Sequence, residues 1–80
     1  MILYIVERRN YNGIVEDSDC FLSSSLENVK TWILNNQDFD TESSNWYWCV
    51  LKIIPDDEYG AELFKIFSRE GIELENKPII

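Results

Sequence analysis

The side chains of this sequence that could do chemistry are mostly carboxylates, because it has fifteen acidic residues, two cysteines and no histidine. The lack of histidine removes the usual general base and the commonest metal ligand. Asp38, Asp40 and Glu42 have the alternating spacing that begins a calcium-binding loop. The match fails later, because the sixth position is Ser43 instead of glycine and the twelfth is Cys49 instead of glutamate.

Other motifs of catalysis or cofactor binding are missing. The chain has no glycine-rich phosphate loop, and its three glycines fall in predicted turns. A chain of 80 residues also leaves little room for a substrate cleft between two carboxylates. We therefore predict a protein that is not an enzyme, with no catalytic residue, no cofactor and no metal site.

The cysteines and the first residues indicate a cellular compartment. Cys20 and Cys49 are too few for a disulfide scaffold and too far apart for a redox pair, so we expect two reduced, mostly buried thiols. The first ten residues lack a basic leader, and their apolar run is too short for a signal peptide or a membrane span. These features favour a cytoplasmic protein without a membrane partner.

The net charge of −8 restricts the possible partners. Direct nucleic-acid binding is disfavoured, because it depends on lysine and arginine displacing counterions. Acidic residues gather in the predicted connections, most densely at Asp56, Asp57 and Glu58. One interpretation is that this charge keeps a small protein soluble. The alternative is an inhibitor that imitates nucleic-acid charge and blocks a nuclease or another nucleic-acid-binding protein.

The elements that must position these residues follow from pattern and turn signals. We predict strands over residues 2–7, 45–54 and 61–68, with a short one at 72–74, and a loop or irregular hairpin between the first strand and residue 22. Ser24 with Glu27 fits a capping box, which predicts a helix over about 25–35. The result is one α+β domain over residues 1–80, of order β-α-β-β(-β). It has a mixed or antiparallel sheet of three to four strands and one helix packed on one face. The first two strands are expected to be parallel.

The segment NWYWCVLKII raises the question of what covers its tryptophans. Trp46, Trp48 and Val50 alternate onto the same side as Lys52, so we expect that side to face away from the helix. The opposite set, Tyr47, Cys49, Leu51 and Ile53, has no charge and is assigned to the helix-packed core. The two tryptophans with Val50 would then expose on the order of 400 to 600 Å², which needs a covering segment, a second copy or a partner.

The stretches FLSSSLENVKTWI, WYWCVLKI and ELFKIFSREGIEL resemble, in outline, those of small uncharacterised β-α-β-β proteins of phages and bacteria. The resemblance covers most of the chain and brings no catalytic motif. It implies a compact accessory protein that binds and modulates a host or phage protein.

The leading hypothesis is a small acidic protein-interaction module that associates with itself, as a homodimer, or with a partner protein. Its interaction residues would be Trp46, Trp48 and Val50, joined by Asp56, Asp57 and Glu58. Replacing both tryptophans by serine or lysine should then abolish association and leave the fold intact.

Overall fold

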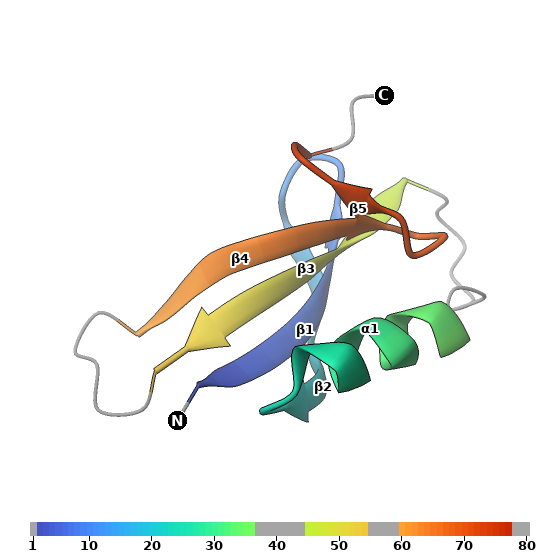
Figure 1. Cartoon of the computed structure of the whole chain (residues 1–80). Coiled ribbons are helices and arrows are strands. Elements are labelled where there is room, and N and C mark those ends of the chain that lie inside the picture. Colours follow the sequence, from blue (N-terminus) through green and yellow to red (C-terminus); the bar gives the residue numbers. More distant parts are fainter. Residues whose placement is uncertain (1, 37–44, 55–59, 78–80) are drawn as a thin grey trace.

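A computed structural model describes residues 2–36, 45–54 and 60–77 of the chain. These residues form one helix and a five-stranded sheet (Figure 1). In chain order the elements are β1 (Leu3–Asn10), β2 (Val15–Ser23), α1 (Leu26–Asn35), β3 (Trp46–Ile53), β4 (Ala61–Ser68) and β5 (Glu73–Leu74). The α+β class is confirmed, but the sheet has five strands, more than the three to four predicted.

The strands lie in the order β2-β1-β3-β4-β5, and every neighbouring pair is antiparallel. The prediction that the first strand and the tryptophan-bearing strand are parallel is therefore wrong. Its error lies in the missing strand β2, since one added strand reverses the direction of the chain before the helix. The helix connects β2 to β3, and β1 lies between these two strands in the sheet.

Strand β2 occupies most of the segment that was predicted to be a loop or an irregular hairpin. The turn before it was predicted from Asn12-Gly13, and Gly13 does adopt a φ of 84° there. The side chain of Asn10 accepts hydrogen bonds from the backbone amides of Asn12 and Ile14. Pairing with β1 shifts register twice, and Asp19 has a φ of 53°, so β2 is a bulged edge strand whose alternation is hard to read from sequence.

Helix α1 begins one residue later than the capping box predicts. The N-cap is Ser25, whose hydroxyl accepts a hydrogen bond from the amide of Asn28 at 3.2 Å. The preceding Ser23 hydroxyl accepts from the amide of Ser25, which fixes the entry of the chain into the helix. On the inner side of the helix, Val29 and Ile33 are fully buried.

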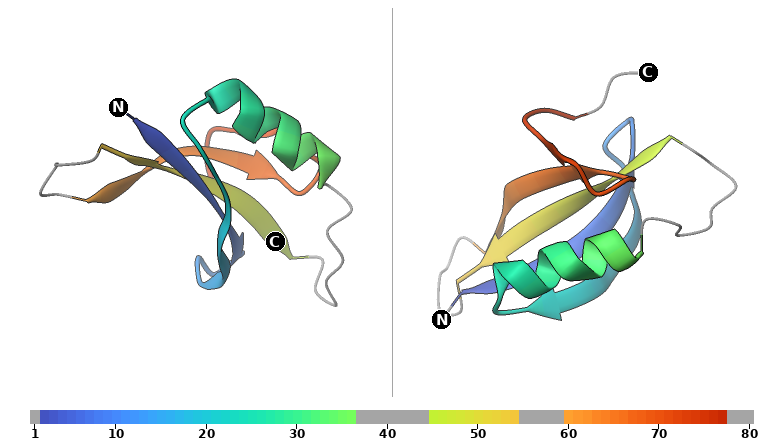
Figure 2. Two further views of the ribbon diagram at one scale, coloured as in Figure 1. Left: turned by 90° about the horizontal axis from the view of Figure 1, so that it is seen from below. Right: turned by 45° about the vertical axis from the view of Figure 1, so that its right-hand side comes forward.

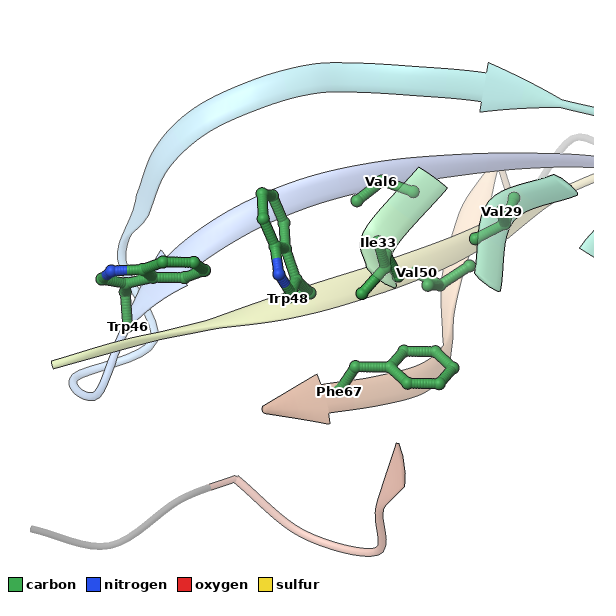
Figure 3. Close-up of a cluster of buried hydrophobic side chains, with 7 residues drawn as sticks. All are labelled: Val6, Val29, Ile33, Trp46, Trp48, Val50 and Phe67. Atoms are coloured by element: carbon green, nitrogen blue, oxygen red, sulfur yellow. The ribbon is translucent and has the colours of Figure 1, made fainter. Parts of the chain in front are cut away.

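The helix lies on one side of the twisted sheet, as the two views of Figure 2 show. Its residues Val29 and Ile33 belong to a buried cluster with Val6, Trp46, Trp48, Val50 and Phe67 (Figure 3). The prediction that Trp46, Trp48 and Val50 face away from the helix is therefore wrong. Directly opposite residues of antiparallel strands share a face, so the pair of Val6 with Val50 places β1 in the same core.

Candidate functional site

The three apolar residues expected to form an interaction surface are core residues. Trp46, Trp48 and Val50 have 0% exposed surface within a single copy of the chain. They therefore offer no area to a partner, and the expected patch of exposed tryptophan does not exist. The acidic members of the predicted site, Asp56, Asp57 and Glu58, lie outside the described residues, as do Asp38, Asp40 and Glu42.

Aromatic rings account for the burial of the tryptophans. The ring of Trp48 makes edge-to-face contacts with two other rings. Its centre lies 4.9 Å from the ring centre of Trp46 and 5.3 Å from that of Trp32 in the helix. Trp32 in turn stacks on Phe21 of β2 at 5.3 Å. These geometries are the favourable ones for ring pairs and add about 0.5 to 1.5 kcal/mol each beyond area burial. The double tryptophan thus fixes helix and sheet together, which answers the question raised by its sequence.

A buried arginine explains part of the acidic character of β2. Arg8 is 7% exposed and donates two hydrogen bonds to one carboxylate oxygen of Asp17, at 3.0 and 2.6 Å, and a third to Glu16 at 2.8 Å. Its guanidinium also lies over the ring of Trp46, with Arg69 5.2 Å from the centre of the same ring. Glu16 and Asp17 therefore stabilise a buried cation, and as structural ion-pair partners they are poor candidates for binding a partner.

The opposite side of the sheet holds a second ion pair, between Glu7 and Arg9. Glu7 is directly opposite Cys49 in the ladder, and Arg9 is opposite Tyr47. Burial raises the pKa of the Cys49 thiol to about 11, although the nearby Arg9 acts to lower it. A thiol with this pKa is protonated at neutral pH and is a weak nucleophile, so Cys49 is a packing residue.

The remaining part of this side is an apolar surface, which we call the helix-free face. It consists of Leu3, Ile5, Leu22, Leu51, Ile53, Leu63 and Ile66, as the cross-strand pairs place them. Leu22 is 57% and Leu63 50% exposed, and the other five are half-buried. The patch crosses four strands, through the pairs of Leu22 with Ile5, Ile5 with Leu51 and Leu51 with Leu63. Contiguous exposed apolar patches on monomers are often functional.

The sequence grouped two of the seven residues of this face, Leu51 and Ile53, but assigned them to the wrong side. Leu51 and Ile53 were placed under the helix, because Lys52 seemed to exclude its own side of the strand. Lys52 lies instead with its ammonium 5.4 Å from the ring centre of Phe64 and 3.6 Å from Glu62. A better signal was available, since two tryptophans have more apolar area to bury than Leu51 and Ile53.

A cavity of about 400 Å³ lies where the β1–β2 turn approaches the β4–β5 turn. It is lined by Tyr11, Trp46, Ser68, Arg69, Glu70, Leu74 and Asn76. The lining combines one cation and one carboxylate with neutral polar groups, and the arginine lies over the tryptophan ring. This arrangement suits recognition of a polar group better than acid–base catalysis, which needs a positioned proton donor and acceptor.

In the part of the chain that the structure describes, no three or more cysteine, aspartate or glutamate side chains gather as metal ligands would. No helix within the described ranges has both the length and the apolarity to cross a bilayer. Comparisons of the chain with protein-family models, with curated proteins and with solved structures find no match.

Proposed function

We propose that the protein is a non-enzymatic interaction module that binds a partner protein through the helix-free face. The observation that carries this proposal is the exposure of Leu22 and Leu63 on the side of the sheet opposite the helix. Burying the exposed half of one such leucine contributes about 1 kcal/mol, so the two leucines and their five neighbours can anchor a small interface. Nothing in this mechanism requires a catalytic group.

The distribution of charge in this chain indicates which charges a partner should carry around the apolar patch that contacts the helix-free face. Six of the fifteen acidic residues lie in 38–42 and 56–58, and the described residues hold the other nine beside all seven basic residues. The excess of negative charge thus belongs to two connections that flank β3. A partner whose apolar patch has a basic rim fits this distribution, and long-range attraction would raise its association rate.

The inhibitor that imitates nucleic acid is the weaker alternative. Two of the acidic residues of β2, Glu16 and Asp17, are engaged with Arg8. The alternative would therefore depend on residues 38–42 and 56–58. The charge-imitating inhibitor would bind through charge alone. If the partner binds the helix-free face, apolar side chains should decide the affinity.

The test uses immobilised protein to capture ligands from a lysate of the source cell, with three forms compared side by side. Leu22→Lys places a charge on the helix-free face, and Ile14→Lys is the matched control, since Ile14 is 62% exposed in the β1–β2 turn, away from that face. Circular dichroism first establishes that each form is folded.

The expected result is a protein retained by the unmodified chain and by Ile14→Lys but lost with Leu22→Lys. Purified, that protein should associate more slowly as salt rises, because the charges are screened. Identical sets of captured proteins from all three forms would refute the proposal. If neutralising Asp56, Asp57 and Glu58 abolished binding while Leu22→Lys had no effect on it, the result would support the charge-imitating inhibitor instead.

A further inference from the structure

The two edges of the sheet differ in how they are protected. Edge strand β2 has two register shifts and a left-handed residue at Asp19, and it carries Glu16 and Asp17. Bulges and charge of this kind discourage another chain from pairing. At the other edge, β5 pairs only with Ile66 and Phe67 of β4. Among the described residues, nothing pairs with the outer edge of β4 over residues 61–65 (Figure 1).

This open half of β4 is exposed and mostly apolar. Ala61, Glu62, Leu63 and Phe64 are all exposed, whereas the half that β5 covers is more buried. Unpaired backbone groups next to exposed apolar side chains form a template for an added strand. In Figure 1 the helix lies beside β1 and β2 and its end approaches the β4–β5 turn, so it leaves the first half of β4 uncovered.

The side chains along the open edge are complementary to themselves. A bulge at Phe64, where Val50 pairs with Lys65 and Leu51 with Leu63, places Phe64 and Lys65 on the same side of the sheet. That is the side of Glu62, which pairs with Lys52 opposite Tyr4. On one side the edge therefore presents the Glu62 carboxylate, 3.6 Å from the ammonium of Lys52, and the Lys65 ammonium, 3.2 Å from a carboxylate oxygen of Glu73. Leu63 lies on the other side.

We propose that a second copy of this chain pairs with the outer edge of β4, antiparallel and about a twofold axis at Leu63. In this register Leu63 meets Leu63 of the second copy, since directly opposed side chains share a face. Glu62 then lies opposite Phe64 of the second copy, next to its Lys65, and the symmetry repeats that pair. Two strand-edge backbones are joined, and the helix-free faces of both copies become continuous.

The charges fix the register more than the affinity, because exposed ion pairs contribute little. Five residues a side form a contact well below the size of a standard interface, so we expect a weak dimer, seen at protein concentrations on the order of 100 μM or above. This proposal concerns the backbone edge of β4, whereas partner binding uses the helix-free face, and the two share Leu63. Leu22, which only the helix-free face contains, separates the failure of one proposal from the failure of the other.

The experiment exchanges the two charges and measures mass by sedimentation in about 0.15 M salt, where repulsion between acidic copies is screened. Glu62→Lys alone and Lys65→Glu alone should each weaken the dimer several-fold, since two attractions become two repulsions. A mixture of the two variants should form a heterodimer, and the double variant should regain the dimer. Urea unfolding checks that each variant is folded.

Leu22→Lys distinguishes this dimer from one formed by the helix-free face, because Leu22 lies on β2 at the far edge of the sheet. It should leave the dimer intact even if it abolishes capture of a partner. A chain that stays monomeric up to about 1 mM would overturn the proposal. So would a dimer that ignores both charge reversals, or a mixture of the two variants that forms no heterodimer.

Discussion

Truncation of Trp48 tests the central structural finding, that the double tryptophan is core and not a binding surface. Trp48 has no exposed surface and two edge-to-face ring contacts, with Trp32 and Trp46. Replacing a buried aromatic residue by alanine costs about 3 to 5 kcal/mol. Loss of two ring pairs places Trp48→Ala near the upper end of that range.

The cost is large in relation to the total stability of a chain of this size. At roughly 0.05 to 0.15 kcal/mol per residue, 80 residues have a free energy of unfolding on the order of 4 to 12 kcal/mol. Trp48→Ala should therefore remove a third or more of it. The double replacement of Trp46 and Trp48 by serine should leave the chain unfolded in water, where an exposed pair would have left the fold intact.

Urea unfolding followed by far-ultraviolet circular dichroism measures this effect without relying on tryptophan fluorescence. The control is Leu22→Ala on the helix-free face, where the side chain is 57% exposed and the expected cost is about 1 kcal/mol or less. Equal urea midpoints for Trp48→Ala and Leu22→Ala would refute the assignment of Trp48 to the core.

Three further predictions concern the ion cluster, the buried thiol and the helix cap. Asp17→Asn should destabilise the fold by about 1 to 3 kcal/mol in urea unfolding, because it leaves the buried Arg8 with a weaker acceptor, and an unchanged midpoint would contradict that role. Burial raises the pKa of Cys49 from 9.0 to about 11, so its stabilising effect is complete below pH 9 and is lost as the pH rises towards 11. Unfolding at several pH values should show a smaller loss of stability over that window for Cys49→Ala than for the unmodified chain, and parallel curves would contradict the assignment. Ser25→Ala should cost about 1 kcal/mol in thermal or urea unfolding by removing the acceptor for the Asn28 amide, whereas no loss would show that another group caps the helix.

The sequence by itself determined the elements whose signals are local. Strand β4 begins at Ala61 and ends at Ser68 as predicted, because turn residues bound a run of strand formers on both sides. Strand β3 and helix α1 match their predicted ranges to within one or two residues. The helix cap moved by one position, from Ser24 to Ser25, since three consecutive serines offer equivalent hydroxyls to the same backbone.

Strand β2 was not predicted from the sequence, because the residues that stabilise it lie elsewhere in the chain. Its acidic residues read as a loop when taken alone, and only the pairing of Glu16 and Asp17 with Arg8 gives them a place in a sheet. The bulge at Asp19 breaks the alternation that would otherwise reveal the strand.

The tertiary structure decided which side of β3 the helix covers, which the alternation of side chains leaves open, and hence which surface is left for a partner. Alternation along the chain separates Trp46 and Trp48 from Leu51 and Ile53, and this separation is correct. It carries no information on which set faces the helix, because that choice depends on the rings of Trp32 and Phe21, contributed by α1 and β2. Side-chain period is a local property of one strand, whereas burial is a property of what the rest of the chain places over it.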